Sequence, residues 1–142
     1  MKAEPYLMFE GRCEEALEFY KSALNAQITT LMRFKDNPDP AAGEGCGEGG
    51  GPGPSPEMVM HAAFTVGSTQ LMASDGMGSG KTSFQGISLA LSPADEAEAH
   101  RTFNALAEGG QVQMPLTKTF FSRAFGMVAD RFGVPWMVVA PE

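Results

Sequence analysis

The sequence is poor in positive charge. Its 142 residues include only 10 lysines and arginines against 17 aspartates and glutamates, which gives a formal net charge of −7. The basic residues are scattered along the chain, so no stretch forms a basic patch. Nucleic acids and anionic membrane surfaces attract clustered positive charge. This composition therefore predicts that neither nucleic acid nor a membrane surface is a partner.

Long apolar runs and a set of paired cysteines are also missing. No run approaches the roughly 20 apolar residues of a membrane-spanning helix, and the N-terminal residues do not form an apolar signal segment. The two cysteines, Cys13 and Cys46, fall in a helical pattern and in a glycine-rich stretch. Two such thiols do not make a disulfide framework. We expect a cytoplasmic protein without a membrane span.

One order of secondary-structure elements occurs twice in the chain. In each half a strand is followed by a helix and then by three strands, as judged from the spacing of apolar residues and the position of turn residues. In the first half the predicted elements lie at 5–9, 12–25, 28–34, 58–66 and 69–74. In the second half they lie at 87–91, 93–108, 111–114, 125–130 and 136–140. Ser92 is the expected N-cap of the second helix, and Gly109 is expected to end it.

This repetition predicts an α+β fold made of two tandem βαβββ modules, with mixed sheets curved around a pocket. Module one spans 1–76 and module two spans 86–142. The first half is longer because of a segment at 36–56, which contains seven glycines and five prolines. That composition has too little apolar surface to offset the entropy of ordering. We interpret the segment as a flexible surface insertion, with a lid over the pocket as the alternative.

Several stretches resemble a known superfamily. They are PYLMFEG at 5–11, EALEFY at 15–20, VMHA at 59–62, LMASD at 71–75 and FGMVADRFGVPW at 125–136. In these stretches the chain resembles the glyoxalase, bleomycin-resistance and extradiol-dioxygenase superfamily, also called vicinal oxygen chelate. Within it the chain looks like the PhnB-like branch, also described as 3-demethylubiquinone methyltransferase-like. The resemblance implies a glyoxalase-like fold and a homodimer.

The resemblance also implies a metal site on the concave sheet face, but the residues here do not suit one. The positions carried over are Pro5, Leu71, Gly86 and Met137. None of these side chains can ligate a hard divalent metal. A shift of one residue in the alignment brings in Glu4, together with Gln85 or Ile87, which is still a poor ligand set. We therefore expect neither a bound metal nor a cofactor.

Two apparent nucleotide-binding features are weak. Residues 76–82 imitate a phosphate-binding loop, but Asp75 occupies the position of the required first glycine, and a strand follows where a helix is needed. We interpret 76–82 as a linker between the modules. The chain also lacks a glycine-rich strand-to-helix turn suited to a nucleotide-like methyl donor.

The residues with the best claim to line a ligand pocket are Phe9, His61, Leu71, Asp75, Ser88, Phe121 and Met137. His61 is either a general base or ligand-binding group, or a structural histidine. Asp75 either projects into the pocket or caps a turn. Asp130 is expected to organise a turn, and His100 to lie on the surface. No catalytic residue can be assigned.

The leading hypothesis is a small-molecule-binding protein without a bound metal, whose ligand the sequence does not identify. The alternative is an enzyme, either metal-dependent in the glyoxalase or dioxygenase manner or methyltransferase-like. A structural or partner-binding role without a small ligand is the third possibility.

The four carried-over positions generate a prediction about metal binding. Chelator-treated protein should bind nickel, zinc, manganese and magnesium no more tightly than an ordinary protein surface, because apolar side chains offer nothing in exchange for the ion's water. Calorimetric titration measures this. Stoichiometric binding tighter than about micromolar, which corresponds to roughly 8 kcal/mol, would favour the enzyme instead.

Overall fold

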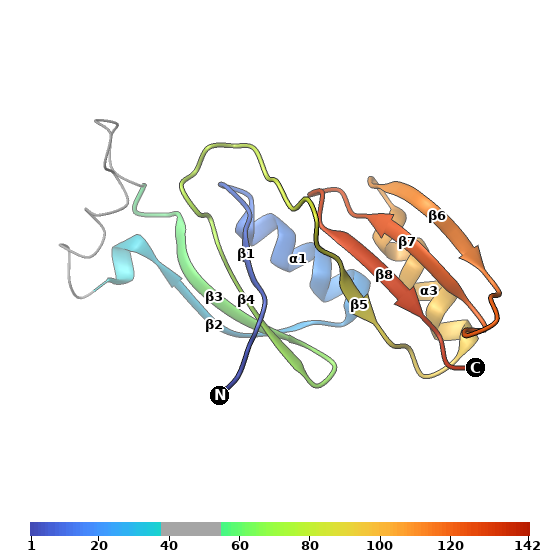
Figure 1. Ribbon diagram of the computed structural model, residues 1–142. Coiled ribbons are helices and arrows are strands. Elements are labelled where there is room, and N and C mark those ends of the chain that lie inside the picture. Colours follow the sequence, from blue (N-terminus) through green and yellow to red (C-terminus); the bar gives the residue numbers. More distant parts are fainter. Residues whose placement is uncertain (38–54) are drawn as a thin grey trace. The chain divides into compact units, whose positions relative to one another are not determined.

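The computed structural model describes residues 1–37 and 55–142 and divides the chain into two compact units (Figure 1). Unit 1 is Met1–Thr82 and unit 2 is Ser83–Glu142. The predicted module boundaries at 76 and 86 lie on either side of this division. Most of the predicted insertion at 36–56 falls outside the described residues, so the loop and lid interpretations stay predictions.

Unit 1 is a four-stranded mixed sheet with one long helix. Its elements are β1 (Tyr6–Met8), α1 (Cys13–Leu24), β2 (Gln27–Arg33), the 3-10 turn η1 (Phe34–Asp36), β3 (Val59–Val66) and β4 (Thr69–Ser74). The strand order is β1-β4-β3-β2, with β1 parallel to β4 and the other pairs antiparallel. Val66 pairs with Thr69, which confirms the hairpin predicted around Gly67.

Unit 2 repeats this topology. Its elements are β5 (Leu89–Leu91), α3 (Glu96–Ala107), β6 (Gln111–Thr117), β7 (Phe125–Ala129) and β8 (Pro135–Val139). The strand order is β5-β8-β7-β6, again with one parallel pair, β5 and β8. The predicted α+β class with two similar modules is confirmed. No helix in the described ranges is long and apolar enough to cross a membrane.

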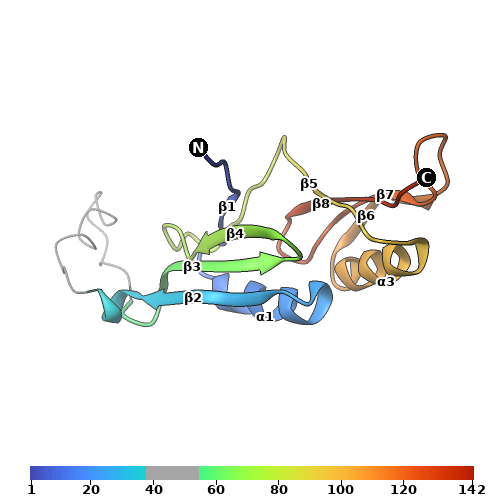
Figure 2. The ribbon, with the colours of Figure 1, turned by 90° about the horizontal axis from the view of Figure 1, so that it is seen from below.

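The core of unit 1 lies between α1 and one face of its sheet (Figure 2). The helix has its apolar residues at the predicted helical spacing, and Ala16, Leu17 and Tyr20 are all buried. The Tyr20 ring stacks on Phe64 of β3, with 6.0 Å between ring centroids. Burial of each such large side chain contributes about 1.5–3 kcal/mol. The helix ends at Asn25, which adopts the left-handed conformation with φ 54°.

The core of unit 2 is built in the same way from α3 and its sheet. The ring of Phe103 in α3 packs closely against Gly126 of β7. A Cβ atom added at Gly126 would lie 2.7 Å from this ring, so only glycine allows the helix to approach the sheet this closely. The predicted N-cap at Ser92 is wrong. The helix begins at Glu96, because the Asp95 side chain accepts a hydrogen bond from the Glu98 N–H at 2.8 Å and caps it there.

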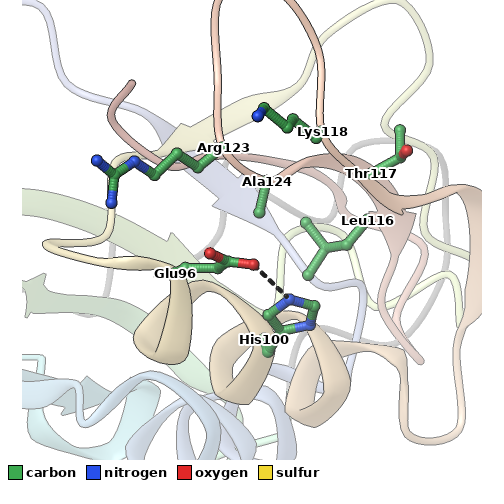
Figure 3. A pocket seen from close by; sticks show the side chains of 7 residues that line it. All are labelled: Glu96, His100, Leu116, Thr117, Lys118, Arg123 and Ala124. Atoms are coloured by element: carbon green, nitrogen blue, oxygen red, sulfur yellow. Dashed lines mark ion pairs between the residues drawn. The ribbon is translucent and has the colours of Figure 1, made fainter.

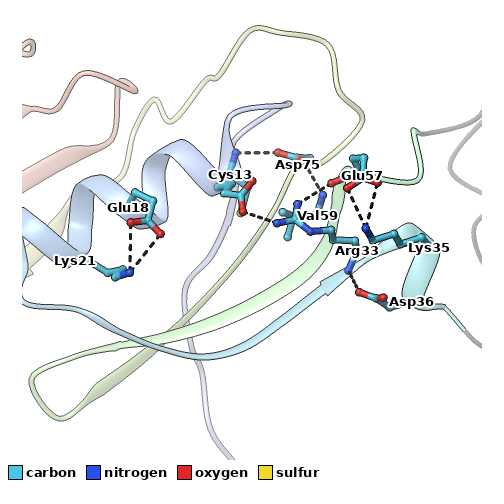
Figure 4. A network of polar contacts seen from close by, with 10 residues as sticks. Cys13, Glu18, Lys21, Arg33, Lys35, Asp36, Glu57, Val59 and Asp75 are labelled. Atoms are coloured by element: carbon cyan, nitrogen blue, oxygen red, sulfur yellow. Dashed lines mark hydrogen bonds and ion pairs between the residues drawn. The ribbon is translucent and has the colours of Figure 1, made fainter.

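The buried carboxylate of Asp75 joins three elements of unit 1 (Figure 4). Oδ1 accepts from the Cys13 N–H at the start of α1 at 2.8 Å, and Oδ2 accepts from the Val59 N–H at the start of β3 at 2.7 Å. Asp75 itself directly follows β4. Two exposed ion pairs lie in the same region, Arg33 with Glu14 and Lys35 with Glu57.

We predict that Asp75→Asn lowers the free energy of unfolding by about 2 kcal/mol, because the amide nitrogen would face a backbone N–H that has no other acceptor. Denaturant unfolding measures the loss. Asp95→Asn is the matched control and should change stability by less than about 0.5 kcal/mol, since asparagine caps helices as well as aspartate does. Equal effects of the two substitutions would contradict the joining role of Asp75.

Candidate functional site

Each sheet has a second face that its own helix does not cover, which we call its open face. In unit 1, side chains alternate along the strands, so the neighbours of buried Leu7, Ala62 and Leu71 point to the open face. Three large apolar side chains there are substantially exposed, Tyr6 at 41%, Met8 at 51% and Met32 at 38%. Such an apolar surface is typical of a binding site.

A tyrosine and a histidine form a polar pair on this apolar surface. The Tyr6 hydroxyl lies 3.3 Å from Nδ1 of His61, and the ring centroids are 5.7 Å apart. Which of the two groups donates depends on the histidine tautomer. Tyr6 comes from β1 and His61 from β3, with β4 between them in the sheet. Sequence reasoning selected His61 but missed Tyr6, because the contact depends on the order of the strands.

A second polar pair on the open face joins Gln70 of β4 to Glu4. Nε2 of Gln70 donates to Oε2 of Glu4 at 3.0 Å, and Lys2 forms an ion pair with the same carboxylate at 3.1 Å. A one-residue shift in the alignment with the superfamily would place Glu4 at one of the metal-site positions. These two side chains do not complete a metal site by themselves. Among the described residues, no group of three or more His, Cys, Asp or Glu side chains is placed to hold a metal ion.

The open face of unit 2 carries a row of methionines. The register pairs Ala90 with Met137, Met137 with Met127, and Met127 with Met114, so these side chains lie side by side across the four strands. Met114 at the edge is 41% exposed. Methionine is flexible and polarizable, and it suits surfaces that adapt to an apolar partner. Met137 therefore lies on the open face of the unit 2 sheet, and its contact with a ligand stays a prediction.

Two predicted pocket residues lie in the core of unit 1 instead. Phe9 is 0% exposed, and its ring lies 6.1 Å from that of Tyr20. Leu71 is 3% exposed and pairs with Phe64, which stacks on Tyr20 of the helix. Leu71 thus points to α1 and His61 to the open face, because the two have opposite parity across the hairpin.

Asp75 is turned inward, and both of its oxygens accept backbone hydrogen bonds. Ser88 is exposed just before β5. Phe121 is 41% exposed and meets Phe120 and Phe125 edge-on, with ring centroids 5.1 and 5.3 Å away. A ligand contact for any of the seven residues stays a prediction.

The predicted turn-organising role of Asp130 is confirmed. Its Oδ1 accepts from the N–H groups of Phe132 and Val134, at 2.9 and 3.1 Å. Oδ2 accepts from the indole N–H of Trp136 at 2.8 Å.

The glycine-rich stretch after β4 holds a carboxylate of the protein itself. Glu10 accepts from the Met77 N–H at 2.7 Å and from the Ser79 hydroxyl at 2.9 Å, and its backbone oxygen accepts from the Gly80 N–H at 2.9 Å. These donors are the kind that a phosphate-binding loop would offer to its ligand. In this chain Glu10 occupies them.

The thiol of Cys13 is not a nucleophile in the folded chain. The side chain is fully buried at the start of α1. Burial, followed by the negative charges of Asp75 and Glu14, raises the pKa of Cys13 from 9.0 to about 12. Only the thiolate attacks electrophiles, so this residue is inert near neutral pH.

Unit 2 also contains a charged hollow with a volume of about 520 Å³ (Figure 3). Its lining residues are Glu96, His100, Leu116, Thr117, Lys118, Arg123 and Ala124. Glu96 Oε1 and His100 Nε2 are 3.7 Å apart on α3, an ion pair when the imidazole is protonated. None of the lining residues was among the predicted pocket residues. His100 was expected to be a surface residue, and its side chain is indeed 53% exposed.

The two mixed sheets, each covered by one helix on one face, define a two-module α+β protein with a glyoxalase-like fold. A glyoxalase-related enzyme from Fulvimarina pelagi has the same fold, with a TM-score of 0.60 at 17% identity over 99% of this chain and 87% of that chain.

The family follows from the sequence comparison. The family model described as 3-demethylubiquinone-9 3-methyltransferase matches residues 1–139, and the chain belongs to this family. Protein YjdN of Escherichia coli (strain K12) is 36% identical over 138 residues, which is 97% of this chain and 94% of that protein.

Two solved structures support the assignment. Protein PA1353 from Pseudomonas aeruginosa is 40% identical with a TM-score of 0.80, over 99% of this chain and 98% of that one. The PhnB protein from Bacillus cereus is 30% identical with a TM-score of 0.76, over 99% of both chains. The predicted PhnB-like relationship is confirmed.

The environment of Cys13 predicts its reactivity. In a Cys46→Ser variant, iodoacetamide at about pH 8 should leave Cys13 unlabelled, because a pKa of about 12 leaves roughly one thiol in ten thousand ionised. The same variant in guanidinium should react fully. Mass spectrometry measures both fractions. Rapid labelling of the folded protein would contradict the burial of this thiol.

Proposed function

We propose that this protein binds a small apolar molecule on the open face of unit 1 without the help of a bound divalent metal. The observation that carries the proposal is the exposed apolar surface of that face with the Tyr6–His61 pair on it. Ligand sites combine an apolar surface with a few polar groups that fix orientation. Here Met8 and Met32 supply part of the apolar surface, and the pair supplies a donor and an acceptor.

The residues of the proposed site contribute little to the stability of the fold. The buried apolar side chains and the Asp75 hydrogen bonds lie on the α1 side of the sheet or at its end. Tyr6 and Met8 are therefore free to serve binding, and substitution at these positions should be tolerated by the fold.

The homodimer and the cytoplasmic location belong to the proposal as well. Each sheet ends in two strands that lack a neighbour on one side within the described units, β1 and β2 in unit 1 and β5 and β6 in unit 2. Unpaired edges favour association with a second chain. The cytoplasmic location rests on the absence of a disulfide framework from the sequence.

An enzyme is the second candidate, and the Tyr6–His61 pair is the observation that favours it. A hydrogen-bonded phenol and imidazole on an accessible surface can pass a proton to or from a bound molecule. The family model is described as a methyltransferase, and the Fulvimarina pelagi structure is described as a glyoxalase-related enzyme, so both descriptions name an enzyme. The metal titration separates the metal-dependent version of this candidate from the proposed one.

We predict that Nile red, a neutral apolar dye, binds the open face of unit 1 and that Met8→Glu weakens this binding about tenfold, because burial of a methionine side chain contributes about 1.5–3 kcal/mol. Dye fluorescence gives the affinity. Met77→Glu is the matched control, since Met77 is 68% exposed and lies outside the strands.

Two further results bear on the same proposal. Tyr6→Phe should weaken dye binding by a smaller factor, because the ring remains and only the hydroxyl is lost. If Met77→Glu and Met8→Glu weaken the dye equally, the dye is not on this face and the proposed site is wrong.

A further inference from the structure

The charged hollow of unit 2 lies on the helix side of its sheet, away from the open face. Leu116 of β6 lines the hollow, and its Cα and Cδ2 lie 3.1 Å from the position that a Cβ on Gly126 would take. The ring of Phe103 from α3 lies 2.7 Å from the same position. Leu116 therefore shares the α3 side of the sheet, and the hollow is distinct from the methionine row.

Two cations in the lining have no acidic partner in the part of the chain that the structure describes. Lys118 and Arg123 come from the two ends of the connection between β6 and β7. Within residues 1–37 and 55–142, no carboxylate lies within 4.0 Å of either cationic group. By contrast, Lys21, Arg33 and Lys35 of unit 1 all pair with glutamates. In a chain with a net charge of −7, two cations that line one hollow and pair with no carboxylate of the described residues give it local positive charge.

The remaining lining residues add a second wall and an apolar floor. Glu96 and His100 face the hollow from α3, and Figure 3 shows Lys118 and Arg123 on the opposite side. Leu116 and Ala124 supply apolar atoms between the two walls, and Thr117 supplies a hydroxyl. Two cations and one carboxylate leave a net charge of +1 when the imidazole is neutral.

The backbone that carries the two cations is held in place. The hydroxyl of buried Ser122 lies 2.6 Å from the Ala140 oxygen and 3.0 Å from the Ala124 oxygen. The Arg123 N–H donates to the Pro141 oxygen at 3.3 Å, and the Thr119 N–H donates to the Ser122 oxygen at 2.9 Å. A loop that is already ordered loses less entropy when a ligand binds.

We propose that this hollow binds a small organic anion that carries a carboxylate or phosphate group. The anionic group binds the Arg123 guanidinium, whose fork matches the oxygens of both chemical groups, and Lys118 on the same side of the hollow adds positive charge. The apolar part of the ligand covers Leu116 and Ala124, and Glu96 accepts a hydrogen bond from a donor on the far side. The volume of about 520 Å³ falls in the range of small-molecule sites, about 300–1,000 Å³. This site is independent of the one proposed on unit 1.

Titration followed by the NMR shifts of backbone amides tests the proposal. The probes are inorganic phosphate and succinate, each added at constant ionic strength, with sodium chloride as the reference. Saturable shifts should centre on Thr117, Lys118, Arg123 and Ala124, with a dissociation constant of roughly millimolar size, since exposed charge pairs each contribute little to affinity. The probe that binds more tightly identifies the preferred anionic group.

Three variants decide whether the hollow itself is responsible. Arg123→Gln and Lys118→Gln should each weaken binding about fivefold, which corresponds to about 1 kcal/mol. Arg101→Gln is the matched control, because Arg101 is an exposed residue of α3 that does not line the hollow, and it should leave the affinity unchanged. Both substituted cations of the hollow are exposed, so these variants should fold, and their amide spectra verify this.

Three outcomes would overturn the proposal. The first is equal weakening by Arg101→Gln and Arg123→Gln, which would indicate diffuse attraction to positive charge. The second is chloride producing the same shifts as phosphate and succinate. The third is the absence of saturation with either probe.

Discussion

Within the described residues, each four-stranded sheet has two faces and one long helix of its own unit to cover them, and the rest of the structure follows from that constraint. Each long helix has 12 residues, and its apolar face packs against one side of its sheet. The strands then separate their side chains by parity, with Leu7, Phe64 and Leu71 on the core side of unit 1 and Tyr6, Met8 and His61 on the other. The exposed apolar surface on which the proposed function rests belongs to the face of the unit 1 sheet that α1 does not cover.

The same constraint explains why the buried polar groups are structural. Asp75 and Asp130 are 5% and 4% exposed. Both oxygens of each carboxylate accept hydrogen bonds from N–H groups, which lie at the ends of elements for Asp75 and in and after a turn for Asp130. Among the described residues, no buried side-chain nitrogen or oxygen lacks a hydrogen-bond partner. A fully satisfied interior has no donor or acceptor left for a ligand. Among the described residues, side-chain groups that a ligand could reach therefore lie at the surface, as in the Tyr6–His61 pair and the hollow beside α3.

Much of the fold could be predicted from the sequence, whereas little of the site could. The helix at 12–25 and the hairpin around Gly67 follow from local signals, apolar spacing and turn residues, and the structure has both. The start of the second helix was misplaced because Ser92 and Asp95 are both good caps and local sequence does not rank them. The face of the sheet on which each residue lies was harder to predict, because shifting a strand by one position exchanges its two faces. Leu71 was expected in the pocket but points to α1, and Gln70, its neighbour, was overlooked.

The sequence by itself determined the order of elements, the repetition of the βαβββ unit, the acidic character and the family, because these depend on composition, periodicity and short motifs. Only the tertiary structure decided which residues meet. Tyr6 and His61 are 55 positions apart in the sequence. They meet because the strand order places β1 and β3 on the two sides of β4, within reach of these two long side chains. Lys118 and Arg123 face Glu96 and His100 because α3 packs against the sheet beside the end of β6. Contacts of this kind depend on strand order and packing, and neither is encoded in the local pattern of residues.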